Sequence, residues 1–216
     1  MLLYTSFLDV KKREVEDKVW IIFSLIGIIL NYSQYEIISY LFSLGITAAI
    51  SFSLYFLGFY GGADAKALIT LSFILPYYPA NYSFHTIAPI ITLTNGIFIT
   101  LTLPLSFILI NTLKIIRGEK IFEGFEEEGK LKKLIAIILG FRSKKVRKFM
   151  FPLEKEEEGK RRFDFKLLGW YNDYVQEEDK WVTPAIPLLV FISLGFLFMI
   201  LFGDIISFLM YKLKSF

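Results

Sequence analysis

Long runs of apolar residues without Asp, Glu, Lys or Arg dominate the hydrophobic pattern of this 216-residue chain. The longest runs cover residues 37–60, 86–113 and 182–203, which are 24, 28 and 22 positions long. About 20 apolar residues in a helix cross the roughly 30 Å hydrocarbon core of a bilayer, so each run is long enough. Lipid offers the backbone no hydrogen-bond partners, which favours helices here. The pattern predicts an all-α integral membrane protein.

Shorter apolar segments raise the expected number of transmembrane helices to about six. The full set of segments is 1–8, 19–30, 37–60, 65–79, 86–113 and 183–210. At 1.5 Å per residue, the first two would extend only about 12 Å and about 18 Å, which is short for a span. Two prolines, Pro76 and Pro79, are expected to end the fourth segment.

The distribution of basic residues predicts the orientation, because Lys and Arg concentrate in cytoplasmic loops. The loop after the first segment, Lys66 and the region 114–182 together hold 22 of the 24 basic residues. The intervening loops, 31–36 and 80–85, hold none. If all six segments span, the N-terminus lies outside and the large loop is cytoplasmic. The two lysines of the C-terminal tail then lie outside, against the trend.

These segments predict three regions along the chain. Residues 1–116 would form transmembrane helices one to five, 117–182 a small cytoplasmic module, and 183–216 the last transmembrane helix with a short tail. A module of 66 residues is small for an independent core, so we expect it to lean on the membrane part. Its stretch KLKKLIAIILGF (130–141) fits either an amphipathic helix on the membrane surface or the core helix of a small domain.

Composition excludes several kinds of site. The chain has no cysteine, so disulfides, thiolate metal sites and cysteine nucleophiles are excluded. A single histidine, His85, argues against a histidine-rich metal site. We expect no metal, no other cofactor and no nucleic-acid partner. The net charge of +3 is small.

Three carboxylates, Asp9, Asp64 and Asp204, lie in or against apolar segments. Ionisable residues inside a membrane are costly and indicate function by default. Asp204 is interpreted as a solvated residue at the outer end of the last helix. Asp9 ends the first segment and Asp64 opens the fourth, so the six-helix topology brings both to the same depth on the cytoplasmic side.

Two carboxylates at one depth can share a proton, so that one acts as an acid and the other as a base. Such a pair can activate water against a peptide carbonyl without a metal or a covalent intermediate. Gly61 and Gly62 lack a Cβ, which lets a substrate backbone approach closely and permits a positive φ. The structural alternatives are a helix-capping role for Asp64 and an ordinary boundary charge for Asp9.

Two stretches, SFLDVKKREVEDKVW and GGADAKAL, resemble the archaeal preflagellin peptidases. These are similar to the type IV prepilin peptidases, membrane aspartic proteases with a G-x-G-D motif. The resemblance implies that Asp9 is the first catalytic aspartate, followed by a basic loop with Arg13 and Val15. It makes Asp64 the second catalytic aspartate, with Lys66 two positions later.

The glycine motif reads Gly61-Gly62-Ala63-Asp64, with alanine where the bacterial pattern has its last glycine. The cysteine-bearing domain of the bacterial enzymes is absent, which argues against their N-methyltransferase activity. The resemblance implies an aspartic endopeptidase in the lipid bilayer. It would cut the short basic signal peptide from archaellin or pilin-like precursors at the cytoplasmic face.

Other residues and other functions stay open at this stage. The acidic runs Glu126–Glu128 and Glu156–Glu158 would either attract a basic leader or form a solvated face. Lys66 would either bias the protonation of Asp64 or extend to the interface. A proton-coupled transporter component would need charges near mid-membrane, which the long runs lack. A non-catalytic membrane scaffold would tolerate Asp9→Asn and Asp64→Asn, whereas the peptidase would not.

Overall fold

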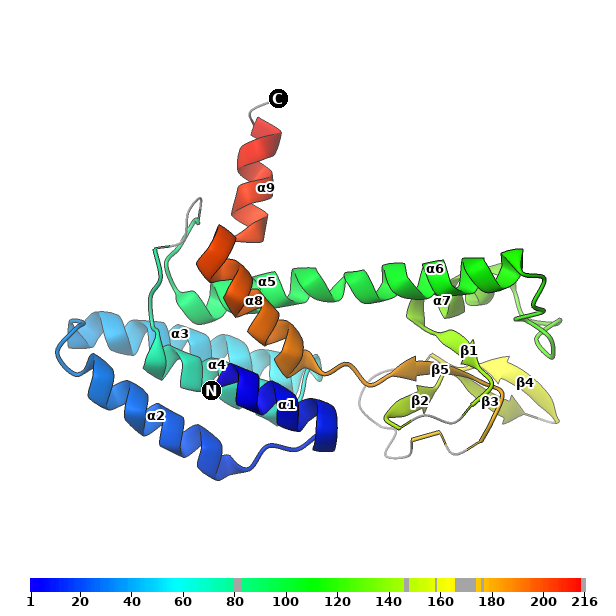
Figure 1. Ribbon diagram of the computed structural model, residues 1–216, viewed down its shortest axis with the longest axis horizontal. Coiled ribbons are helices and arrows are strands. Elements are labelled where there is room, and N and C mark those ends of the chain that lie inside the picture. The colour runs from blue at the N-terminus through cyan, green and yellow to red at the C-terminus, as the bar shows by residue number, and fades with distance from the viewer. Residues whose placement is uncertain (80–82, 146–147, 158, 166–173, 176, 215–216) are drawn as a thin grey trace. The chain divides into compact units, whose positions relative to one another are not determined.

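The computed structural model describes residues 1–79, 83–145, 148–157, 159–165, 174–175 and 177–214. The chain divides into two compact units (Figure 1). Unit 1 comprises Met1–Thr100 and Pro187–Phe216, and unit 2 comprises Leu101–Ile186. Residues 101–116 therefore belong with the region expected to form the soluble module.

Unit 1 is helical in its described residues. Its helices are α1 (Leu2–Lys12), α2 (Asp17–Asn31), α3 (Ile37–Phe56), α4 (Gly62–Ile74), α5 (Ala88–Thr100), α8 (Leu188–Phe202) and α9 (Ile205–Lys214). The central helix is α4, which contacts α2, α3, α5 and α8. Its alanines Ala65 and Ala67 and its leucines Leu68 and Leu71 are buried. Small side chains on α4 let its neighbours pack closely, which explains the alanine-rich stretch after the glycines.

The expected six spans are not found. Two helices, Ile37–Phe56 and Ala88–Ile116, are long and apolar enough to cross a membrane in the described part of the chain. Helices α8 and α9, which are bent by 47° at a short break, make a third span if they count as one. Helices α1, α2 and α4 have 11, 15 and 13 residues, fewer than the roughly 20 that a span needs. Because unit 2 also contains strands, the prediction of an all-α protein with about six transmembrane helices is wrong.

Glycine and asparagine fix the contact between α2 and α4. A Cβ on Gly27 would lie 2.6 Å from the backbone carbon and oxygen of Phe73, so only glycine fits. Such small residues let helix backbones approach closely in membrane proteins. One turn later, the Asn31 amide donates hydrogen bonds to the carbonyls of Phe73 (2.8 Å) and Ile74 (2.9 Å). These carbonyls end α4 and have no partner within the helix.

The break between α8 and α9 is held by polar side chains. Gly203 has a φ of 91°, and its carbonyl accepts a 2.9 Å hydrogen bond from the Asn95 side chain. Asn95 also accepts a 2.9 Å hydrogen bond from the Ile205 amide. Asp204 accepts one from the Ile206 amide at 3.1 Å and thereby caps α9. Asp204 is thus a helix-end residue, but it is only 6% exposed, so its interpretation as solvated is wrong.

Unit 2 combines helices and short antiparallel strands. Its elements are α6 (Thr102–Ile116), α7 (Lys130–Leu139), β1 (Phe141–Ser143), β2 (Met150–Pro152), β3 (Glu154–Glu157), β4 (Lys160–Phe163) and β5 (Lys180–Pro184). One sheet has the strand order β1-β5-β2, and the other pairs β3 with β4. In the second sheet Glu154 lies opposite Phe163.

An aromatic core holds unit 2 together. Trp181 is fully buried, and its indole donates a 3.1 Å hydrogen bond to the Ile121 carbonyl. The rings of Phe125 and Phe163 stack with centroids 4.3 Å apart. Helix α7 contributes the fully buried Ala136 to this core, while Leu131 remains exposed. Helix α7 therefore packs on the core of unit 2 through one face, and its exposed leucines Leu131 and Leu134 leave the membrane-surface interpretation open as well.

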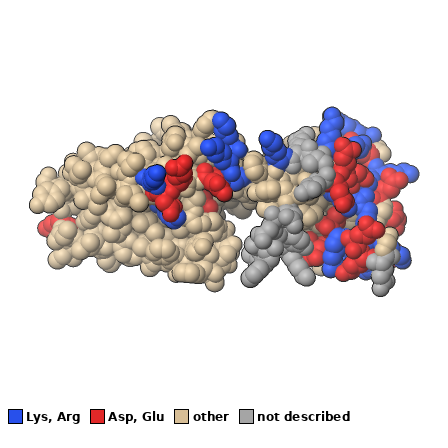
Figure 2. Space-filling view, turned by 90° about the horizontal axis from the view of Figure 1, so that it is seen from below, with Lys and Arg blue, Asp and Glu red and all other residues tan. Residues whose placement is uncertain are grey.

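Charged side chains are distributed differently over the two units. They gather densely on unit 2, whereas most of the visible face of unit 1 carries none (Figure 2). Unit 2 also contains a buried ion pair between Glu154, whose side chain is 1% exposed, and Arg161. The guanidinium donates to both carboxylate oxygens at 3.0 Å. The Trp181 amide donates to the same carboxylate at 2.9 Å, so the core and the ion pair support each other.

Candidate active site

Asp64 lies in the first turn of α4. Gly61 is the N-cap residue, and the Asp64 carboxylate accepts a 3.0 Å hydrogen bond from the Gly61 amide. This contact satisfies one of the amides that a helix start leaves without a partner. Asp64 is 8% exposed. The capping alternative is therefore partly right, because Asp64 reaches back to the N-cap amide, although it is not itself the N-cap residue.

Asp9 lies in the last turn of α1, close to a second helix N-terminus. Its carboxylate accepts a hydrogen bond from the backbone amide of Leu189, in the first turn of α8. It also forms an ion pair with Arg13 at 3.5 Å between Oδ1 and Nη1. Arg13 ends α1 with a φ of 60°, in the left-handed region. The positive end of α8 and the guanidinium both stabilise the ionised form of Asp9.

The two carboxylates are close enough to repel each other. Burial raises the pKa of Asp64 to about 7, and the hydrogen bond from Gly61 opposes that increase. The charge of Asp9 raises this pKa further, while the charge of Arg13 lowers it. Burial also raises the pKa of Asp9, against the effect of Arg13. Near neutral pH the pair can therefore hold one proton between two acids in different surroundings.

The glycines before Asp64 do not have the backbone geometry that reserves a position for glycine. Gly61 has a φ of −80°, and Gly62 is not among the residues with a positive φ. A Cβ on Gly61 or Gly62 would meet no atom closer than 3.5 Å or 3.7 Å, respectively. Neither φ nor internal packing demands glycine here. Ala63 packs against the core of unit 1.

Lys66 forms an ion pair that neither interpretation of the sequence considered. Its ammonium group forms an ion pair with Asp17, in the first turn of α2, and about half of its side chain is exposed. The pair links α2 to α4 on the surface of unit 1. The structure thus brings together Asp9, Arg13, Asp64 and the Gly61 amide, while Lys66 is engaged elsewhere.

The acidic runs of unit 2 are largely occupied by their own ion pairs. Glu127 pairs with Lys160 at 2.6 Å, and Glu128 pairs with Lys132 at 3.0 Å. Glu157 pairs with Lys155 at 2.7 Å. Of these runs, Glu158 lies outside the described residues. The pairs reduce the charge available for attracting a basic leader, so they favour the solvated-face interpretation.

The sequence argument missed the contribution of α8. The Ser6 hydroxyl donates a 2.9 Å hydrogen bond to the Leu189 carbonyl and lies 2.6 Å from the Ser193 hydroxyl. Ser6 precedes Asp9 by three positions, so both lie on one face of α1. These contacts hold α1 against the start of α8, where the Leu189 amide meets Asp9. The three-residue spacing is a signal for Ser6, but nothing in the sequence points to Leu189.

Comparisons with known proteins match nearly the whole chain. The model of the type IV leader peptidase family matches residues 1–110, and that of the archaeal peptidase A24 C-terminus, type II, matches residues 131–205. The preflagellin peptidase of Methanocaldococcus jannaschii is 30% identical over 229 residues, which cover 94% of this chain and 91% of that protein. The chain belongs to the type IV leader peptidase family.

Two further preflagellin peptidases are similar to this chain. The preflagellin peptidase of Methanococcus maripaludis is 29% identical, and that of Methanococcus voltae is 27% identical. Each match covers 94% of this chain and 92% of the relative. The protein is a membrane protease, which favours the peptidase over the transporter and the scaffold. Among the described residues, no three His, Asp or Glu side chains are grouped so that they could hold a metal ion.

Proposed function

We propose that Asp9 and Asp64 form the catalytic pair of an aspartic endopeptidase that removes the leader of preflagellin-like precursors. One observation carries this proposal: two largely buried carboxylates, each at a helix N-terminus, repel each other inside a leader peptidase. Three relatives are preflagellin peptidases, which supports preflagellin as the substrate. Pilin-like precursors remain the second candidate substrate class.

The surroundings of the two acids suggest their roles. Asp64, whose pKa is raised to about 7, would supply the proton, and Asp9, held by Arg13 and the Leu189 amide, would act as the base. Asp9 takes a proton from water, whose oxygen bonds to the scissile carbonyl carbon, while Asp64 protonates the carbonyl oxygen. As the C–N bond breaks, Asp9 returns its proton to the leaving amine. Asp64 recovers its proton from the hydroxyl group that becomes the carbonyl.

The glycines give this pair a route to its substrate. A peptide must approach within hydrogen-bond reach of both carboxylates for these proton transfers. Because Gly61 and Gly62 carry no side chain, an extended backbone could approach the start of α4 closely there. Arg13 and the Gly61 amide would then act indirectly, by stabilising the ionised form of the carboxylates.

The basic residues support a cytoplasmic location for the cut. Unit 2 carries most of the Lys and Arg residues, and four more follow Asp9 between residues 11 and 18. Cytoplasmic segments are enriched in such residues. We propose that unit 2 and the Asp9 end of α1 face the cytoplasm. The signal peptide would be cut at this membrane face.

A processing assay tests the pair. The full-length peptidase is co-expressed with a preflagellin precursor and, separately, with a pilin-like precursor. We expect Asp9→Asn and Asp64→Asn each to slow cleavage by at least about 100-fold, because acid or base catalysis contributes about 10²–10⁴-fold. Cleavage is measured as the shift from precursor to mature protein on a gel.

Asp17→Asn is the matched control for this assay. It removes the same charge eight positions after Asp9, at a side chain that is 71% exposed, and should leave cleavage unchanged. Each variant must insert into the membrane at the wild-type level. Normal cleavage by an inserted Asp9→Asn or Asp64→Asn protein would remove that residue from the mechanism.

A further inference from the structure

Helices α1 and α8 are joined through both polar backbone groups of one residue, Leu189. Its carbonyl accepts a 2.9 Å hydrogen bond from the Ser6 hydroxyl, and its amide donates a hydrogen bond to the Asp9 carboxylate. Ser6 and Asp9 are three positions apart, on one face of α1. One turn of α1 therefore binds the carbonyl and the amide of a single residue in the first turn of α8.

A second hydroxyl, that of Ser193, completes this contact. Its oxygen lies 2.6 Å from the Ser6 oxygen and 2.9 Å from the Leu189 carbonyl oxygen. Each hydroxyl has one proton to donate, so Ser193 donates to Ser6 when Ser6 donates to the carbonyl. Ser6 is 9% exposed and Leu189 is 1% exposed, so water competes little for these hydrogen bonds. We call the hydrogen bonds among the two hydroxyls and this carbonyl the serine contact.

The serine contact is not needed to satisfy the Leu189 carbonyl. In a regular helix this carbonyl accepts the amide four positions later, which is that of Ser193. What the serine contact adds is a fixed placement of α1 on α8. The Leu189 amide, in contrast, belongs to the first turn of α8, where amides have no partner in their own helix. It is therefore available to Asp9 as long as α1 keeps this placement.

Two charged groups act on Asp9 besides this amide. Arg13, on the same helix, pairs with Asp9 at 3.5 Å, and Asp64 on α4 repels it. Arg13 follows Asp9 by one turn, so its contact is local to α1 and its end. The Leu189 amide comes from another helix, so its effect on Asp9 depends on how α1 lies against α8.

We propose that Ser6 and Ser193 are positioning residues for Asp9, which hold α1 in the register at which the Leu189 amide bonds to the carboxylate. The catalytic consequence rests on the proposed function, because a base must be ionised to accept a proton from water. A hydrogen bond to the ionised form lowers the pKa of a carboxyl group, so weakening it raises the pKa of Asp9. Ser6 is the direct link between the helices, and Ser193 supports it from α8.

Titration of the Asp9 carboxyl group tests this positioning role without using cleavage. Aspartate is isotopically labelled in the full-length protein in neutral detergent, and the NMR signal of Asp9 is identified by its absence from Asp9→Asn. We expect Ser6→Ala to raise the pKa of Asp9 by about one pH unit, the effect of weakening a hydrogen bond to a charged group. Ser193→Ala should raise it less, because Ser6 still bonds to the Leu189 carbonyl.

The matched control is Ser43→Ala, which removes another buried serine of unit 1. The Ser43 hydroxyl donates a 2.9 Å hydrogen bond to the Pro76 carbonyl, beyond the end of α4 that lies away from Asp64. This variant should leave the pKa of Asp9 unchanged. An unchanged pKa of Asp9 in Ser6→Ala, or an equal rise in Ser43→Ala, overturns the positioning role.

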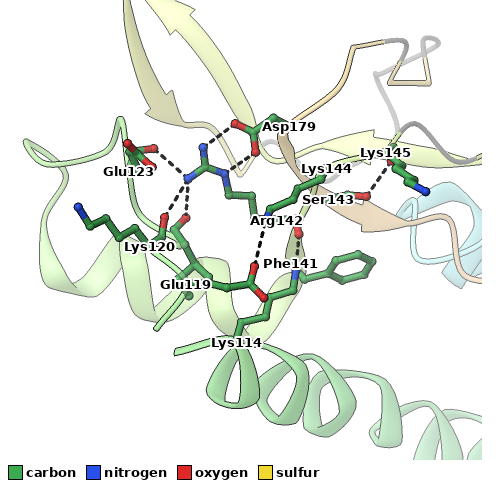
Figure 3. Close-up of a pocket in the computed structure, with 11 residues that line it drawn as sticks. Lys114, Glu119, Lys120, Glu123, Phe141, Arg142, Ser143, Lys144, Lys145 and Asp179 are labelled. Carbon is green, nitrogen blue, oxygen red and sulfur yellow. Dashed lines mark hydrogen bonds and ion pairs between the residues drawn. The ribbon is translucent and has the colours of Figure 1, made fainter. Parts of the chain in front are cut away.

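Asp179 provides an internal reference in the same spectra. It lies in unit 2, where the Arg142 guanidinium donates to both of its oxygens at 2.6 Å and 2.7 Å (Figure 3). Its signal is identified by its absence from Asp179→Asn. Because the serine contact is in unit 1, Ser6→Ala should not change the titration of Asp179. A rise in both pKa values would mean a general change in the protein and would overturn the inference.

The pH profile of cleavage connects the titration to catalysis. A raised pKa of Asp9 should move the acid limit of kcat/KM to higher pH by the same amount, while the alkaline limit, set by Asp64, stays in place. An equal loss of rate at every pH, with the pKa of Asp9 unchanged, would show a purely structural role for Ser6 and overturn the inference. If the pKa of Asp9 rises but the acid limit does not move, the positioning role holds and the proposed role of Asp9 as the base fails.

Discussion

Buried carboxylates are treated in opposite ways in the two units. In unit 2, both oxygens of the buried Glu154 accept hydrogen bonds from Arg161. In unit 1, Asp64 has a hydrogen bond from the Gly61 amide, and the charge of Asp9 acts against its own. Unit 2 thus binds both oxygens of its buried carboxylate to a guanidinium, whereas in unit 1 Asp64 lies near the like charge of Asp9, which Arg13 offsets only in part.

This difference separates structural acids from acids that can change protonation. A carboxylate whose two oxygens both accept hydrogen bonds from one guanidinium, like that of Glu154, is held in place and orders the fold. A buried carboxylate beside a like charge has its pKa raised toward neutral pH, which is the condition for acid catalysis. Substitutions in unit 2 should therefore act on stability, and those in unit 1 on rate.

The largest expected effect on stability comes from Glu154→Gln. The substitution removes the buried charge that Arg161 and Lys180 share, while Asp179 still pairs with Arg161 at 3.4 Å, so we expect a loss of about 2 kcal/mol in the free energy of unfolding of unit 2. Hydrogen exchange of unit 2 peptides in the full-length protein measures it. Glu157→Gln, in an exposed pair, should change nothing measurable. Hydrogen-exchange rates in Glu154→Gln equal to those of the wild type would contradict the structural role of Glu154.

The pH dependence of cleavage tests the expectation that Asp64 in unit 1 changes its protonation near neutral pH. Because the pKa of Asp64 is raised to about 7, its proton is present below that pH and lost above it. We expect kcat/KM to fall about tenfold per pH unit above pH 7. At lower pH the rate should fall as Asp9, whose pKa is also raised, becomes protonated. Initial cleavage rates of a precursor from pH 4 to pH 9 measure both limits.

Lys66→Gln is the control for this profile. Lys66 pairs with Asp17, so its loss should leave the alkaline limit near pH 7. A shift of that limit would restore the hypothesis that Lys66 biases Asp64. A flat rate between pH 7 and pH 9 in the wild type would contradict the assignment of Asp64 as the acid.

The smallest effect is expected from Asp179→Asn. The Asp179 side chain is 45% exposed, so the pair with Arg142 should contribute no more than about 1 kcal/mol. The Arg142 guanidinium lowers the pKa of Asp179, so this stability is fully present above pH 4 and lost as the pH falls through the folded-state value. Asn tolerates the φ of 56° at this position.

Thermal unfolding of unit 2 in wild type and Asp179→Asn, followed at pH 7 and at pH 3, provides the measurement. The small difference at pH 7 should shrink at pH 3. If the stability difference between wild type and Asp179→Asn instead grows as the pH falls, the ion pair between Asp179 and Arg142 is not its cause.

The sequence located most helices but not which of them cross the membrane. The apolar run 37–60 corresponds to a helix at Ile37–Phe56, and the run 86–113 to α5 and α6. Apolar composition reports burial or contact with lipid, and it does not distinguish a short packed helix from a span. Helix α4 illustrates this, since its buried face is filled by the other helices of unit 1. Strands of three to five residues, such as KRRF at 160–163, leave too little alternation to detect.

At the candidate site, the sequence named the two acids but not what holds them. Asp9 and Asp64 stood out because carboxylates are rare beside apolar runs, and their catalytic role stays a prediction. The hydrogen bond from Leu189 depends on contact between residues 180 positions apart, which no local pattern encodes. The partner of Lys66 was missed for the same reason: Asp17 is 49 positions away.

The contact between Asp9 and the Leu189 amide also sets an order of events during biosynthesis. The first helix emerges from the ribosome at the start of translation, and the amide that meets its carboxylate belongs to one of the last helices to be made. A nascent chain that ends before residue 187 carries both acids but lacks that amide. On the proposed assignment of Asp9 and Asp64, the catalytic pair therefore reaches its full set of hydrogen bonds only after nearly the whole polypeptide has been synthesised.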